Sequence, residues 1–137
     1  MNKQAFFLAV FLVCLLIAIP ATGLRAQAAE DYSWEGTWIA EGSFFSVAVT
    51  VSENRFVVAA VESLGFEWST EAGTVVGQQA AIEVSYAGAT ALILVQLIDA
   101  NIAVASAASC LPEYLVVCAL AQNRQARFVR VEPISAQ

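Results

Sequence analysis

Histidine is absent from this 137-residue sequence, lysine occurs only at Lys3, and the three cysteines are Cys14, Cys110 and Cys118. Serine and cysteine nucleophiles usually need a neighbouring histidine or lysine as base. Zinc sites are built mostly from histidines and several thiolates. These absences argue against nucleophilic catalysis and against a metal site, so we expect a protein that is not an enzyme and uses no cofactor.

The N-terminal residues 1–28 have the layout of a cleaved secretory signal peptide. Lys3 precedes an apolar run of 15 residues at positions 5–19, and Ala26-Gln27-Ala28 matches the small-residue pattern of a signal peptidase site. That run is shorter than the ~20 residues that a membrane-spanning helix needs. We therefore expect a periplasmic or secreted protein, formed by residues 29–137, with no stable membrane span after cleavage.

Negative charge dominates the remaining residues 29–137. They hold four arginines and all twelve acidic residues, which gives a formal charge of −8. Such a surface repels the phosphate backbone of nucleic acids. We therefore expect no nucleic-acid partner.

Cys110 and Cys118 are the two cysteines beyond the signal peptide, with seven residues between them. An exported compartment permits disulfides, and the spacing is wider than the C-x-x-C arrangement that redox pairs typically use. We expect a structural disulfide across a hairpin of two strands, at 102–109 and 115–121. Closing so short a loop contributes about 2–3 kcal/mol to stability.

The main pattern beyond residue 35 is a period of two. Apolar residues alternate with small or polar ones at 45–52 and again at 80–86, which is typical of strands with one buried face. Residues 91–98 are apolar on both faces. A helix competes as an interpretation of 91–108, but the turn at 99–101 and the β-branched residues favour two strands.

About eight short strands, with turns roughly every ten residues, predict an all-β fold. Short connections favour antiparallel neighbours, and an antiparallel meander loses its exposed edges when it closes into a barrel. Membrane barrels need strands of about 9–11 residues, and most of these are shorter. We therefore predict that residues 29–137 form one small soluble β-barrel domain.

The segment Gly36-Thr37-Trp38, at the start of the first predicted strand, resembles the Gly-x-Trp opening of lipocalin-like and avidin-like barrels. In those families the tryptophan plugs one end of the barrel and packs near an arginine of the closing strand. The last predicted strand offers Arg127 and Arg130. The resemblance implies a cation–π plug, which we assign to Trp38 and Arg130.

An eight-stranded barrel is wide enough to hold one small ligand. The predicted inward-facing residues form the candidate ligand-binding set: Phe45, Val47, Val49, Phe56, Val58, Trp68, Ile82, Val84 and Tyr86. Trp34 precedes the first strand and is a candidate exposed contact. Phe66 and Trp68 flank Glu67, and they are candidates for a pocket mouth or a partner site.

Three interpretations of function remain open. The first, which we favour, is an exported carrier that binds a small apolar ligand inside the barrel. The second is a protein-binding module, such as an inhibitor of a secreted hydrolase, that acts through the N-terminal segment 29–33. The third is an envelope structural or assembly subunit. Apolar outer faces such as that of 91–98 also indicate a homodimer.

Overall fold

The computed structural model describes residues 32–131. The predicted signal peptide at 1–28, the stretch 29–31 and the C-terminal residues 132–137 lie outside the described residues.

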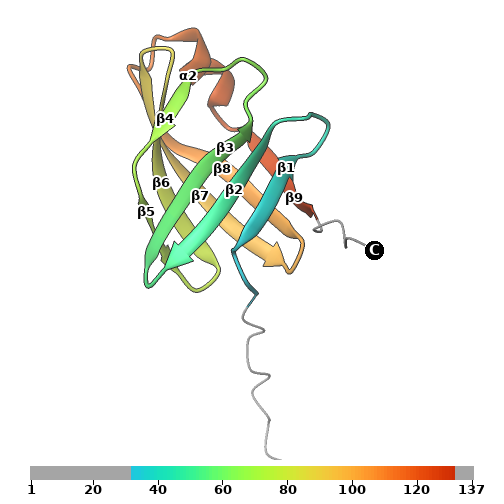
Figure 1. Ribbon diagram of the computed structural model, residues 1–137. Helices are drawn as coiled ribbons and strands as arrows, with labels where there is room; N and C mark the ends of the chain where they lie inside the picture. Colours follow the sequence, from blue (N-terminus) through green and yellow to red (C-terminus); the bar gives the residue numbers. More distant parts are fainter. Residues whose placement is uncertain (1–31, 132–137) are drawn as a thin grey trace, which may run out of the picture.

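The described chain contains nine strands and one short helix, and its strand pairings are antiparallel (Figure 1). In chain order the elements are β1 (Gly36–Ala40), β2 (Ser46–Ser52), β3 (Arg55–Glu62), β4 (Trp68–Thr70), β5 (Gly73–Val76), β6 (Gln79–Tyr86), β7 (Ala89–Asp99), β8 (Ile102–Leu111), α2 (Val116–Ala121) and β9 (Gln125–Val131). No helix among the described residues is long and apolar enough to cross a membrane.

The strands close into a ring of eight positions, because β4 and β5 share the position beside β6. β1 pairs with β2 on one side and with β9 on the other, and β6 pairs with β7. The pairings of β7 with β8 and of β8 with β9 complete the ring. The predicted fold is confirmed: the described chain is a closed antiparallel β-barrel built as a meander.

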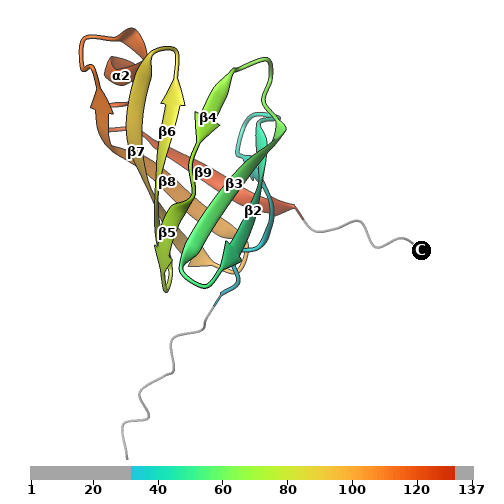
Figure 2. The same cartoon turned by 60° about the vertical axis from the view of Figure 1, so that its left-hand side comes forward.

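The pairing is shortest at the seam between β3 and β5 (Figure 2). Only two residue pairs join these strands, Arg55 with Thr74 and Phe56 with Gly73. On its other side β5 lies close to β6, because a Cβ added at Gly73 would lie 2.1 Å from the carbonyl oxygen of Ala81. The strand β5 can approach β6 this closely because position 73 carries no side chain.

The hydrophobic core lies inside the barrel. Trp38 and Phe56 are each 2% exposed, and Leu97 is fully buried. Alternation places one face of each strand in this interior, so that Ile82 of β6 is buried while its neighbour Glu83 is exposed. Burial of these inner faces is the main driving force for closing the sheet.

The expected strand at 115–121 is wrong, because α2 occupies this stretch. In a strand, Val116, Cys118 and Leu120 would share one face, whereas in α2 Cys118 is buried and the other two are exposed. The segment is apolar at every position, so its sequence pattern does not distinguish the two periods. The helix begins after Leu115, whose carbonyl oxygen accepts the backbone N–H groups of Cys118 and Ala119 at 3.0 and 3.1 Å.

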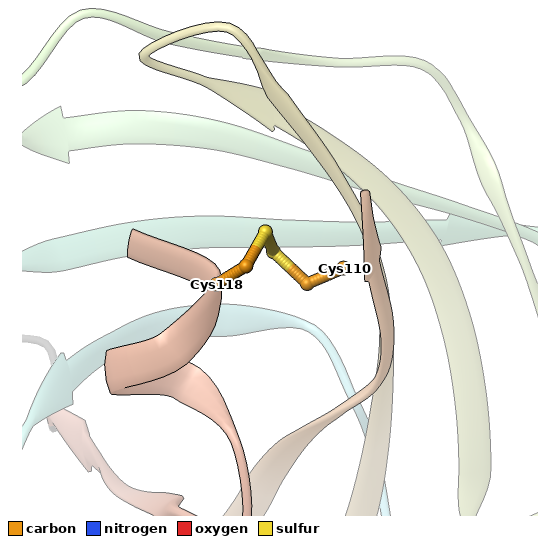
Figure 3. Close-up of a disulfide and its surroundings, with 2 residues drawn as sticks. All are labelled: Cys110 and Cys118. Carbon is orange, nitrogen blue, oxygen red and sulfur yellow. A yellow bond between two sulfur atoms is a disulfide. The ribbon is translucent and has the colours of Figure 1, made fainter. Parts of the chain in front are cut away.

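The predicted disulfide between Cys110 and Cys118 is confirmed, but it does not join two strands (Figure 3). It links the end of β8 to α2, with the two Cα atoms 5.3 Å apart. The bond therefore holds the helix against one end of the barrel.

We expect the double substitution Cys110→Ser/Cys118→Ser to lower the free energy of unfolding by about 2 kcal/mol, because the loop between the cysteines gains conformational freedom when the chain unfolds. Urea unfolding followed by tryptophan fluorescence measures this change. Adding reductant should lower the free energy of unfolding of the wild-type protein by a similar amount and leave that of the double variant unchanged. The prediction would be contradicted if the urea midpoint of the wild-type protein stays the same after reduction, with both thiols shown to be free.

Candidate functional site

A cavity of about 640 Å³ lies inside the barrel. All nine residues of the predicted ligand-binding set lie on its wall. Phe45 lies immediately before β2, and the other eight come from β2, β3, β4 and β6. The structure thus brings the whole set together around one space.

The predicted set lacks the part of the wall that β7, β8 and β9 supply. The missed apolar residues are Ile93, Val95, Ala103, Ala105, Ala107, Ala126 and Phe128. On β7 both faces are apolar, so alternation could not show that Ile93 and Val95 face inward while Leu92 and Leu94 face outward. On β9 the sequence does indicate one of these residues. Arg130 is predicted to face inward, and Phe128, two residues earlier, must lie on the same face of the strand.

Trp34 and Trp38 line the deep end of the cavity. The Trp34 Nε1–H donates to the carbonyl oxygen of Gly77 at 2.8 Å, and the Trp38 Nε1–H donates to the carbonyl oxygen of Trp34 at 3.0 Å. The Trp34 ring also meets Phe56 edge to face, with centroids 5.2 Å apart. The expectation that Trp34 is an exposed contact is wrong: it is 7% exposed, because its indole closes the barrel end and finds an acceptor there.

Arg130 covers Trp38 from β9, with its guanidinium carbon 4.4 Å from the centre of the indole ring. The guanidinium donates to the carbonyl oxygens of Ser33 and Glu35, and its Nε–H donates to that of Ala100 at 2.8 Å. Desolvation by burial lowers the pKa of Arg130, yet an arginine stays protonated at physiological pH. The contact implied by the Gly-x-Trp resemblance is therefore present at the deep end of the cavity.

Gly36 makes room for this arrangement. Its φ of 137° is one that residues with side chains rarely adopt, and an added Cβ would lie 2.8 Å from a terminal nitrogen of Arg130. The glycine of the Gly-x-Trp segment thus has a direct physical role beside the tryptophan.

Arg127, the other arginine of the last predicted strand, does not reach Trp38. It lies three residues from Arg130 and therefore on the opposite face of β9. Its guanidinium forms an ion pair with Glu41 on the outside of the barrel, at 3.1 Å.

The other end of the cavity is lined by aromatic side chains. Phe66 and Tyr86 meet edge to face at 5.7 Å, and Phe45 and Trp68 lie 6.0 Å apart. Phe66 is 50% exposed, and the exposed Arg124 and Gln125 also line the cavity. The cavity therefore opens at this end, where Figure 1 shows α2 and the loop between β3 and β4.

The wall of the cavity is mainly apolar. Trp68 donates its indole N–H to the Ser63 hydroxyl at 3.1 Å, so all three tryptophan N–H groups have protein acceptors. Arg124 is the single charged residue on the wall, which holds no carboxylate. Among residues 32–131, no group of three or more cysteine and acidic side chains is placed to hold a metal ion.

Comparisons with protein-family models, with curated proteins and with solved structures found no match for this chain.

Proposed function

We propose that this protein binds a small apolar molecule inside its barrel and is an exported, non-enzymatic carrier of lipocalin-like architecture. The observation that carries the proposal is the cavity of about 640 Å³ with an almost wholly apolar wall. Small-molecule sites typically measure about 300–1,000 Å³ and are lined mainly by apolar and aromatic side chains. The Cys110–Cys118 disulfide supports export, because such bonds persist in oxidising compartments.

Water is a poor occupant of this cavity. A buried water needs about three hydrogen-bond partners, and the indole N–H groups of the wall are already engaged within the protein. An apolar ligand that covers the wall removes apolar surface from water, which contributes about 25 cal/mol per Å². The interior is therefore better matched to a hydrocarbon than to solvent.

Binding of the neutral probe N-phenyl-1-naphthylamine tests the proposal. Trp34, Trp38 and Trp68 all line the cavity, so a probe inside it should receive energy from tryptophan excitation. We expect saturable binding of one probe per barrel. A wild-type protein, folded by circular dichroism, that gives no saturable signal would overturn the proposed function.

The other two interpretations are alternative outcomes of that test. The inhibitor hypothesis depends on the segment 29–33, of which 29–31 lie outside the described residues. The assembly and homodimer hypotheses depend on the outer face of β7, where Leu92, Leu94 and Ile98 are 38%, 44% and 52% exposed. Both stay predictions, to be examined by pull-down and by sedimentation if the probe does not bind.

A further inference from the structure

The polar groups on the cavity wall are concentrated towards its open end. Ser106 of β8 pairs directly with Gln125, the first residue of β9, and Arg124 precedes it. Tyr86 lies at the end of β6 beside the aromatic cluster of the mouth. The deep end, in contrast, is closed by Trp34 and Trp38, whose N–H groups are engaged. The cavity therefore has one polar end and one apolar end.

Arg124 and Arg55 are the two described arginines whose side chains have no hydrogen bond or ion pair, and of the two only Arg124 lines the cavity. Arg127 is paired with Glu41, and Arg130 is held against Trp38 and three carbonyl groups. Arg55 lies at the turn between β2 and β3, at the end of the barrel away from α2 (Figure 1). Within residues 32–131 the Arg124 side chain makes no hydrogen bond or ion pair, although acidic residues are abundant in this protein.

An unpaired cation at the mouth of an apolar cavity complements one kind of ligand. A guanidinium binds carboxylate and similar anions through paired N–H donors. A hydrocarbon tail is favoured in the apolar interior. A molecule with both parts would place its tail towards Trp38 and its head beside Arg124.

We propose that the ligand is a single-tailed amphiphile with an anionic head group, such as a long-chain carboxylate, and that Arg124 binds the head. This inference rests on the proposed function, because it specifies the ligand class of the same cavity. Ser106, Gln125 and Tyr86 supply further hydrogen-bonding groups near the head. Head-group recognition at an exposed arginine selects among ligands, while burial of the tail provides most of the affinity.

The test is displacement of bound N-phenyl-1-naphthylamine by palmitate, palmityl alcohol and methyl palmitate, which share a tail and differ in the head. We expect palmitate to bind the wild-type protein about five times more tightly than the two neutral competitors, the range of an exposed ion pair. Arg124→Gln should remove this preference. Arg124→Glu should reverse it, so that palmitate binds more weakly than the two neutral competitors. Arg55→Gln, the same charge change at the far end, should leave the preference intact.

The outcomes separate the two proposals. Equal affinity for all three competitors, unchanged in Arg124→Gln, overturns the anionic-head inference and leaves the apolar carrier in place. A preference for palmitate that Arg55→Gln reduces as much as Arg124→Gln also overturns it, because the effect is then one of net charge. Failure of the neutral probe to bind the wild-type protein overturns the proposed function itself.

Discussion

Replacing Arg130 with alanine is expected to lower the free energy of unfolding by about 3 kcal/mol, the largest loss of stability that we predict. The substitution removes the cation over Trp38, worth about 0.5–2 kcal/mol, and charge-assisted hydrogen bonds worth about 1.5–3 kcal/mol each in favourable settings. Those bonds join three separate segments, at Ser33 and Glu35, at Ala100 and on β9. Partial exposure of the guanidinium keeps the expected total below the sum of these values.

Urea unfolding measures this loss, and Arg127→Ala is the matched control. Arg127 lies on the same strand and has one ion pair with exposed partners, so its loss should cost less than about 1 kcal/mol. Equal effects of the two substitutions would contradict a special role for Arg130 at the closed end. A second variant, Trp38→Phe, should weaken the same contact while keeping an aromatic ring in the core.

The double substitution Ala105→Phe/Ala126→Phe should lower the affinity for N-phenyl-1-naphthylamine at least about tenfold. Ala105 of β8 and Ala126 of β9 are direct cross-strand partners, and both line the cavity. Two phenyl rings at these positions would project into the space that the ligand needs. They would displace the ligand without disturbing a packed core, because the cavity is open there.

The barrel offers a matched control on its outer surface. Ala48 of β2 and Ala59 of β3 are also cross-strand partners, and neither lines the cavity. Ala48→Phe/Ala59→Phe adds the same two rings outside, so the affinity for the probe should change less than about twofold. A similar loss of binding in both double variants would show that the probe does not occupy the interior.

The architecture could be predicted because the decisive pattern is local. Alternation at 45–52 and 80–86 assigns each residue to one face of a strand, and the structure places Phe45, Val47 and Ile82 on the cavity wall accordingly. Short turns between such strands then leave few topologies, of which a closed meander is the simplest. Six of the nine predicted cavity residues lie in these two alternating segments.

The features that escaped prediction have no such pattern. β7 is apolar on both faces, so only the closed ring decides that Ile93 faces inward. All six residues of α2 are apolar. A segment without polar residues shows neither the helical period of 3.6 nor the strand period of two. Trp34 and Arg124 lie outside the strands, and their surroundings depend on where distant turns meet. Tertiary contacts alone place them at the two ends of the cavity.

Native mass spectrometry of the protein, purified gently from its own exported compartment and then incubated with N-phenyl-1-naphthylamine, tests the central claim most directly. The carrier account predicts a complex of one barrel with one small molecule of constant mass, either retained from the source or taken up as the probe. The fraction of protein with the adduct should fall strongly in Ala105→Phe/Ala126→Phe and stay near that of the wild type in Ala48→Phe/Ala59→Phe. A folded wild-type protein that shows only its unliganded mass before and after incubation would contradict the account.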